Sequence, residues 1–200
     1  MKKLLSLICL LPMLGALASA QEMRQDISLS FMGTIQPYIN GGVNAVTAKS
    51  TIGTGLLLSY RYQLTPNGAF EANYSFSHYT EKFTSSFAAA RVYTALQEST
   101  LAYVRTIPFK NFNPFIEFGG GIQYFTPGGG LRTTSYDTEQ TEAAIFLFGG
   151  GVAYQLSPTW DLRMQYRGIV TSPQDFALKQ FSIGRRFIVS QPAIGFAYHF

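Results

Sequence analysis

The sequence is poor in the residues that usually carry catalysis or bind metals. Its 200 residues include one cysteine, Cys9, and two histidines, His78 and His199. A single thiol excludes an intramolecular disulfide, and two distant histidines give no ligand cluster for a transition metal. We therefore expect no metal, no cofactor and no thiol chemistry in this protein.

Charge is also scarce, at 13 % of the residues, whereas aromatic residues reach 15 %. Lys2 and Lys3 supply two of the four net positive charges, so the basic balance does not support a nucleic-acid partner. Beyond residue 20 no segment approaches the 18 consecutive apolar residues of a membrane helix. If the chain crosses a membrane, it must do so with strands.

The first 20 residues are typical of a secretory signal peptide. Lys2 and Lys3 form a short basic start, residues 4–17 are apolar, and Ala18-Ser19-Ala20 has the small residues of a cleavage site. We expect residues 1–20 to be removed, and Cys9 with them. Residues 21–200 then form one domain of a size common among β-barrels.

After residue 20 the dominant signal is the alternation of apolar and polar residues, which predicts β-strands. Turn signals divide the chain into eight candidate strands. They are residues 26–34, 52–64, 69–80, 91–106, 114–125, 143–156, 160–171 and 186–200. Each is long enough to cross a membrane at a tilt, which takes about 9–11 residues.

The connections between these strands alternate in length. The short ones are residues 65–68, 108–113 and 157–159, and the long ones are residues 35–51, 81–90, 126–142 and 172–185. Short turns on one side and long loops on the other are typical of outer-membrane barrels. The sequence predicts an all-β fold, an eight-stranded antiparallel up-and-down transmembrane β-barrel with its turns in the periplasm.

Alternation alone does not decide which face points inward. In the segment 160–168, Trp160, Leu162 and Met164 alternate with Asp161 and Arg163. A soluble lipocalin-like carrier would bury the apolar face, whereas a membrane barrel exposes it to lipid. The low charge favours the membrane barrel, and so do the many small residues on the polar face, because they suit a narrow lumen.

Aromatic residues gather beside the short turns, as expected at a membrane interface. The predicted aromatic girdle comprises Tyr62, Phe70, Tyr154 and Trp160, with Tyr198 and Phe200 at the same level. Ordinary packing would explain any single ring, but not the shared level of all six.

The polar face predicts a charged network inside the barrel. If the turn of strands 52–64 and 69–80 is centred on Pro66, Arg61 lies opposite Glu71. Centring the turn of strands 143–156 and 160–171 on Pro158 places Gln155 opposite Asp161. The predicted network comprises Arg61, Glu71, Glu117, Asp161, Arg163 and Arg167. An unpaired buried charge costs several kcal/mol, so mixed signs at one level favour pairing. We interpret the network as a plug, with a gate or selectivity element as the alternative.

Segments 113–121, 161–167 and 195–200 resemble those of the OmpA/OmpX-type small outer-membrane β-barrel proteins of Gram-negative bacteria. The resemblance covers nearly all of residues 21–200 and is architectural. In that family the last strand is recognised by the barrel assembly machinery. The resemblance therefore implies an assembly signal at Ile194, Phe196, Tyr198 and Phe200. It covers only the barrel, without the peptidoglycan-binding domain of larger members.

We expect a monomeric structural or surface-interaction protein whose four loops meet an extracellular ligand. We also expect contacts with outer-membrane lipid and with lipopolysaccharide. Arg185 and Arg186 are candidates to contact the phosphates of lipopolysaccharide; the alternative is that they form only a solvated rim. A narrow pore remains an alternative. A lipid A-modifying enzyme is disfavoured, because His78 faces lipid whereas Ser75 and Ser77 face inward.

Overall fold

The computed structural model describes residues 24–41, 46–84, 89–128, 140–172 and 186–200, which form β-strands and their connections. None of these residues belongs to a helix long and apolar enough to cross a membrane. The strands are β1 (Gln25–Thr34), β2 (Ile39–Gly41), β3 (Val46–Ser50), β4 (Gly53–Thr65), β5 (Gly68–Thr84), β6 (Ala89–Thr106), β7 (Phe112–Gly128), β8 (Thr141–Gln155), β9 (Trp160–Thr171) and β10 (Phe187–His199).

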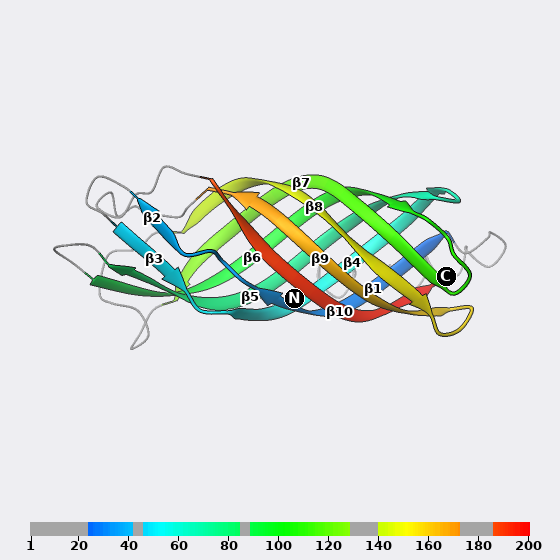
Figure 1. The fold of residues 1–200 in the computed structure, drawn as a ribbon, viewed down its shortest axis with the longest axis horizontal. Coiled ribbons are helices and arrows are strands. Elements are labelled where there is room, and N and C mark those ends of the chain that lie inside the picture. The colour runs from blue at the N-terminus through cyan, green and yellow to red at the C-terminus, as the bar shows by residue number, and fades with distance from the viewer. Residues whose placement is uncertain (1–23, 42–45, 85–88, 129–139, 173–185) are drawn as a thin grey trace, which may run out of the picture.

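Eight strands, β1 and β4 to β10, close into an antiparallel barrel (Figure 1). Every strand pairs with its neighbours in this series, and β1 closes the barrel against β10 from Asp26↔His199 to Met32↔Ala193. The predicted eight-stranded antiparallel barrel is confirmed. We call the end with the β4–β5, β6–β7 and β8–β9 connections and the C-terminus the turn end, and the opposite end the loop end.

The prediction of a loop over residues 35–51 is wrong in part, because this segment contains the β2–β3 hairpin. β4 pairs with β5 only as far as Thr54↔His78, and β5 continues beyond that point to Thr84. The free edge of β5 is covered by β3, from Ser50↔Glu81 to Thr47↔Thr84. Covering an exposed strand edge satisfies its backbone hydrogen-bonding groups.

The predicted register of two hairpins is confirmed. Arg61 lies opposite Glu71, and Gln155 lies opposite Asp161. A register shift between Gln63 and Thr65 then lets Thr65 pair with Gly68, which leaves a two-residue turn between β4 and β5.

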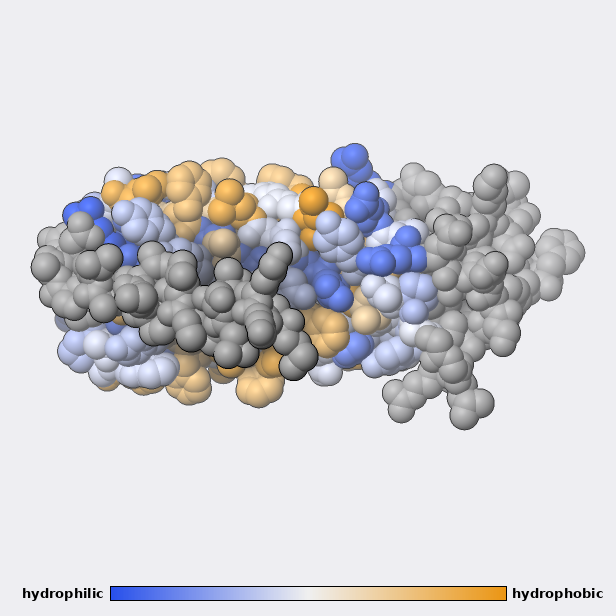
Figure 2. Space-filling view, turned by 180° about the vertical axis from the view of Figure 1, so that it is seen from behind, coloured by the Kyte–Doolittle hydropathy of each residue, from blue (hydrophilic) through white to orange (hydrophobic). Residues whose placement is uncertain are grey.

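The apolar residues face outward and the polar residues face inward. Phe31 on β1 is 75 % exposed, whereas the neighbouring Ser30 is buried. Figure 2 shows hydrophobic side chains over the middle of the barrel wall and hydrophilic side chains gathered toward the loop end. A band of exposed Leu, Ile, Phe and Tyr around a closed barrel matches the surface that lipid requires.

The interior also contains an apolar layer. Many residues on the inner face are small, yet Ile145 and Leu147 on β8 are buried there. They pack in a cluster with Ala102, Ile169 and Val189. Leu147 pairs with Ile169, and Ile169 pairs with Val189, so the layer crosses three adjacent strands.

Candidate functional site

The most distinctive site is a set of buried ion pairs inside the barrel near its turn end. Arg61 on β4 contacts Glu71 on β5, with Arg61 Nε 2.7 Å and Nη2 2.6 Å from the same Glu71 oxygen, Oε2. Both side chains are almost inaccessible to solvent. The register that places these two residues opposite each other therefore also produces an ion pair.

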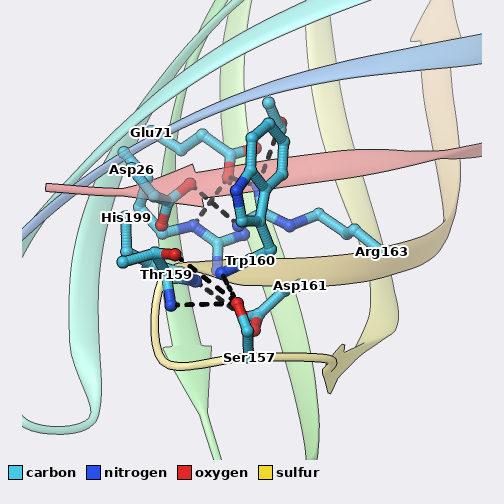
Figure 3. Close-up of polar contacts among 10 residues, drawn as sticks. Asp26, Glu71, Ser157, Thr159, Trp160, Asp161, Arg163 and His199 are labelled. Carbon is cyan, nitrogen blue, oxygen red and sulfur yellow. Dashed lines mark hydrogen bonds and ion pairs between the residues drawn. The ribbon is translucent and has the colours of Figure 1, made fainter.

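Arg163 on β9 reaches across the interior and joins strands that are not its neighbours. Its Nη2 lies 2.8 Å from Asp26 Oδ1 on β1, and its Nη1 lies 3.5 Å from Glu71 Oε2 and donates to Ser28 Oγ at 3.1 Å. Figure 3 shows Arg163 between these two carboxylates. One guanidinium group therefore links β9, β1 and β5 across the lumen.

The lumen-facing ring of Phe115 on β7 lies against this cluster. The guanidinium carbons of Arg61 and Arg163 lie 4.8 Å and 6.0 Å from the ring centroid. A desolvated cation beside an aromatic face gains electrostatic stabilisation in addition to its ion pairs. The aromatic ring thus contributes to holding both arginines inside the barrel.

A second cluster surrounds Arg167 on β9. Its Nη2 lies 2.8 Å from Glu98 Oε1 and donates to Thr100 Oγ1 at 3.1 Å, while its Nη1 donates to Gln191 Oε1 at 3.1 Å. Glu98 Oε2 accepts hydrogen bonds from Gln191 at 3.1 Å and from Gln123 at 2.8 Å. This cluster therefore ties β6, β7, β9 and β10 together.

Asp161 was expected in the arginine network, but its direct partner in the structure is His199. His199 Nε2 lies 2.8 Å from Asp161 Oδ2, and the histidine side chain keeps 17 % of its surface exposed. Asp161 thus pairs at the rim of the turn end with a residue that the sequence analysis left outside the network.

Glu117 is buried without a partner. It is 2 % exposed, and neither of its carboxylate oxygens has a hydrogen-bond partner among the described residues. Opposite Glu117 stands Gly149, where an added Cβ would lie 2.7 Å from Glu117 Oε1. The absence of a side chain on Gly149 therefore makes room for this carboxylate.

We expect Glu117→Gln to leave the free energy of unfolding unchanged or to raise it. The three buried arginines already balance Asp26, Glu71 and Glu98, so the amide removes a surplus charge without leaving an arginine unpaired. The same change at Glu71 should lower this free energy, because Arg61 would lose its carboxylate. Denaturant unfolding of both variants would test this, and equal losses would contradict it.

Several members of these clusters were not predicted from the sequence. Asp26, Phe115 and Glu98 occupy inward positions of their strands. The hydrogen-bonding partners that were also not predicted are Ser28, Thr100, Gln123 and Gln191. The available signal was position: an acidic or aromatic residue on the polar face of a predicted strand faces the same lumen as the arginines.

The residues of the predicted assembly signal lie on the last strand, beside β1. Ile194, Phe196 and Tyr198 point outward, between 39 % and 54 % exposed. Phe200 N donates to the Gln25 carbonyl oxygen at 2.9 Å, so the final residue is held against β1.

The predicted girdle residues all lie outward near the turn end. Tyr62 pairs with Phe70 across β4 and β5, and Trp160 pairs with Tyr198 across β9 and β10 with ring centroids 5.1 Å apart. Tyr154 on β8 is 44 % exposed. Their shared level is consistent with one interface of a bilayer.

His78 lies near the loop end on the outer face of β5. Its ring contacts Phe76, with centroids 4.5 Å apart, and stacks on Tyr93 at 5.4 Å. Ser75 and Ser77 are buried on the opposite face of the strand. Arg185 and Arg186 were predicted to contact phosphate. Arg185 and most of the last long loop lie outside the described residues, while Arg186 is exposed immediately before β10.

Groups of three or more metal-ligating side chains do not occur in the described part of the chain. A family model described as the outer membrane protein beta-barrel domain matches residues 6–200. No curated protein sequence matches the chain.

Solved structures resemble the fold. OprG from Pseudomonas aeruginosa aligns with a TM-score of 0.63 and 13 % identity, over 88 % of this chain and 95 % of OprG. Neisserial surface protein A aligns at 0.59 and 12 %, over 88 % and 97 %. Ail of Yersinia pestis, solved in complex with the heparin analogue sucrose octasulfate, aligns at 0.50 and 15 %, over 88 % and 99 %. At these identities the likeness concerns the fold alone.

Proposed function

Because this chain belongs to the outer membrane protein β-barrel domain family, we propose that it is a structural or surface-interaction protein with a closed lumen, acting through its extracellular loops. Residues 1–20 would direct its export as a signal peptide and would then be cleaved. In the usual orientation of such barrels the turn end lies in the periplasm and the loop end outside. The protein would act as a monomer in contact with outer-membrane lipid and lipopolysaccharide.

This proposal depends on one observation: the interior of the barrel is almost inaccessible to solvent. Arg163, Arg167 and Glu71 are at most 1 % exposed, and so are Leu147 and Ile169 in the apolar layer. An eight-stranded barrel has an interior just wide enough for side chains to fill. The interior contains buried ion pairs near the turn end and an apolar layer next to them, and this arrangement supports a plug rather than a path for ions.

The outer surface supports roles for two further sets of residues. The rings of Tyr62, Phe70, Tyr154 and Trp160 would anchor the turn end at the periplasmic interface. The outward residues Ile194, Phe196 and Tyr198, with Phe200 at the chain end, would form the signal read by the assembly machinery.

The closed lumen predicts that the purified protein, reconstituted in planar bilayers, will give no stable current steps above those of protein-free bilayers. A folded sample is one that shifts in gel mobility on boiling, which separates closure from failure to insert. A general porin reconstituted in the same way provides the positive control. Reproducible steps that change on Leu147→Ser, a substitution in the apolar layer, would contradict the closed lumen and favour a narrow pore.

A further inference from the structure

Three cationic residues stand in one row across neighbouring strands at the loop end. Lys49 on β3 pairs with Lys82 on β5, and Lys82 pairs with Arg91 on β6. Figure 1 shows β3 beside the part of β5 and β6 that extends past the barrel. Paired residues in an antiparallel sheet lie about 5 Å apart, so the row spans roughly 10 Å. Lys49 and Lys82 are both exposed.

This row has no acidic neighbour on its own face. From Thr80 toward the loop end, the outward positions of β3, β5 and β6 whose side chains the structure describes hold Thr47, Lys49, Thr80, Lys82, Thr84 and Tyr93. The adjacent Glu81 is 6 % exposed and lies on the inner face. No ion pair joins Lys49 or Lys82 to a carboxylate in the described part of the chain.

Like charges directly opposite each other destabilise a sheet unless an anion lies between them. We infer that Lys49 and Lys82 bind the phosphate groups of lipopolysaccharide in the outer leaflet. This inference rests on the proposed outer-membrane orientation, which puts the loop end outside. Ammonium and guanidinium groups make their strongest hydrogen bonds to such anionic oxygens.

The surface below the row favours an amphiphilic lipid over a free anion. Along β5, the outward positions change from Phe76 and His78 to Thr80 and then Lys82. The ring of His78 stacks on Tyr93 at 5.4 Å, so an aromatic layer lies roughly 14 Å from Lys82 along the strand. A lipid would place its phosphates at the lysines and its acyl chains at the aromatic residues, so an amphiphilic molecule fits both parts of this surface.

The test measures binding of purified lipopolysaccharide to the full-length protein in neutral detergent. The variant Lys49→Gln with Lys82→Gln should bind roughly 30-fold more weakly, from the usual contribution of a cation near an anionic membrane surface. The matched control, Arg105→Gln with Lys110→Gln, removes two exposed cations at the turn end and should bind normally. A shift in gel mobility on boiling verifies that each variant is folded.

Three further ligands identify what is bound. Dephosphorylated lipopolysaccharide should bind the unaltered protein about as weakly as the intact lipid binds the lysine variant, and inorganic phosphate should not compete at equal phosphate concentration. Equal affinity of the lysine variant and the control for intact lipid would overturn the inference. So would tighter binding of a soluble sulfated glycan than of lipopolysaccharide. Bilayer currents would overturn the closed lumen and leave this binding result standing.

Discussion

Replacing Arg163 by alanine is expected to lower the free energy of unfolding by about 3–5 kcal/mol. The substitution leaves Asp26 buried and without its ion pair, because the guanidinium of Arg163 lies 2.8 Å from that carboxylate. Glu71 keeps its bond to Arg61, so most of the loss falls on Asp26. Removing one partner from a buried pair costs more than the pair itself contributes, because the remaining charge stays desolvated.

The control for this variant lies two residues further along the same strand. Gln165 faces inward, is 6 % exposed and makes no ion pair, and its Oε1 has no hydrogen-bond partner. Gln165→Ala should therefore cost only about 1 kcal/mol. The two variants create space on the same face of β9 and differ in whether a charge is left unpaired.

Denaturant unfolding in lipid vesicles would measure both variants. The chain has a single tryptophan, Trp160, at the start of β9, so its fluorescence reports on the strand that carries both substitutions. The gel-mobility shift on boiling gives an independent measure of the folded fraction. Equal losses for Arg163→Ala and Gln165→Ala would mean that the ion pairs add nothing beyond filled volume.

The register of the hairpins could be predicted because it depends on local rules, whereas the direction of the faces was inferred from the low charge and from the small residues on the polar face. Side chains alternate with a period of two, and a turn centre fixes which residues face each other. Arg61 and Glu71 could therefore be paired from the sequence, as they are in the structure. The outward positions of Leu101 on β6 and the inward positions of Glu98 and Thr100 follow from the same alternation.

Partners across the lumen could not be predicted in the same way. Arg163 on β9 reaches Asp26 on β1 and Glu71 on β5, neither of which lies opposite it in the ladder. Such contacts depend on strand tilt, barrel stagger and side-chain reach, which are properties of the closed barrel. Asp161 was assigned to the arginines, whereas the pairing of β9 with β10 places Ala197 opposite Asp161 and so brings His199 beside it.

The β2–β3 hairpin was not predicted from the sequence, for a different physical reason. Its segment has no alternation strong enough to indicate strands, and β3 pairs along the part of β5 that passes Glu81. The hairpin therefore depends on an exposed edge created elsewhere in the fold. The same extension of β5 brings Lys49 beside Lys82, so the cationic row could not be recognised from sequence spacing.

Gly195→Ala is expected to lower the free energy of unfolding by about 1–3 kcal/mol. Gly195 lies on β10 at the seam where the barrel closes, opposite Ser30 on β1. A Cβ at this position would overlap the Leu29 carbonyl oxygen and the Ser30 backbone. Because backbone atoms cannot turn aside as a flexible side chain can, the two strands would have to separate locally.

Gly33→Ala is the control for this variant. It tests whether the loss of stability in Gly195→Ala is caused by this close contact or would follow from replacing any glycine in the seam. Gly33 lies on β1 in the same seam, and its added Cβ would meet Pro192, with Cγ nearest at 3.5 Å, an ordinary van der Waals contact. Alanine there reduces the freedom of the unfolded chain, so stability should stay equal or rise by about 0.4–1 kcal/mol. The two substitutions are chemically identical, but only Gly195→Ala is predicted to lower the free energy of unfolding.

Unfolding followed by Trp160 fluorescence would measure the change in the free energy of unfolding for both variants. Gly195→Ala should also reduce the fraction that runs as the compact form in unboiled gel samples, because closure of β1 onto β10 completes the barrel. If both alanine variants were equally stable, the seam would have room for a methyl group at Gly195. The close approach of β1 and β10 would then not limit closure, and the side chains inside the barrel would have to supply most of its stability.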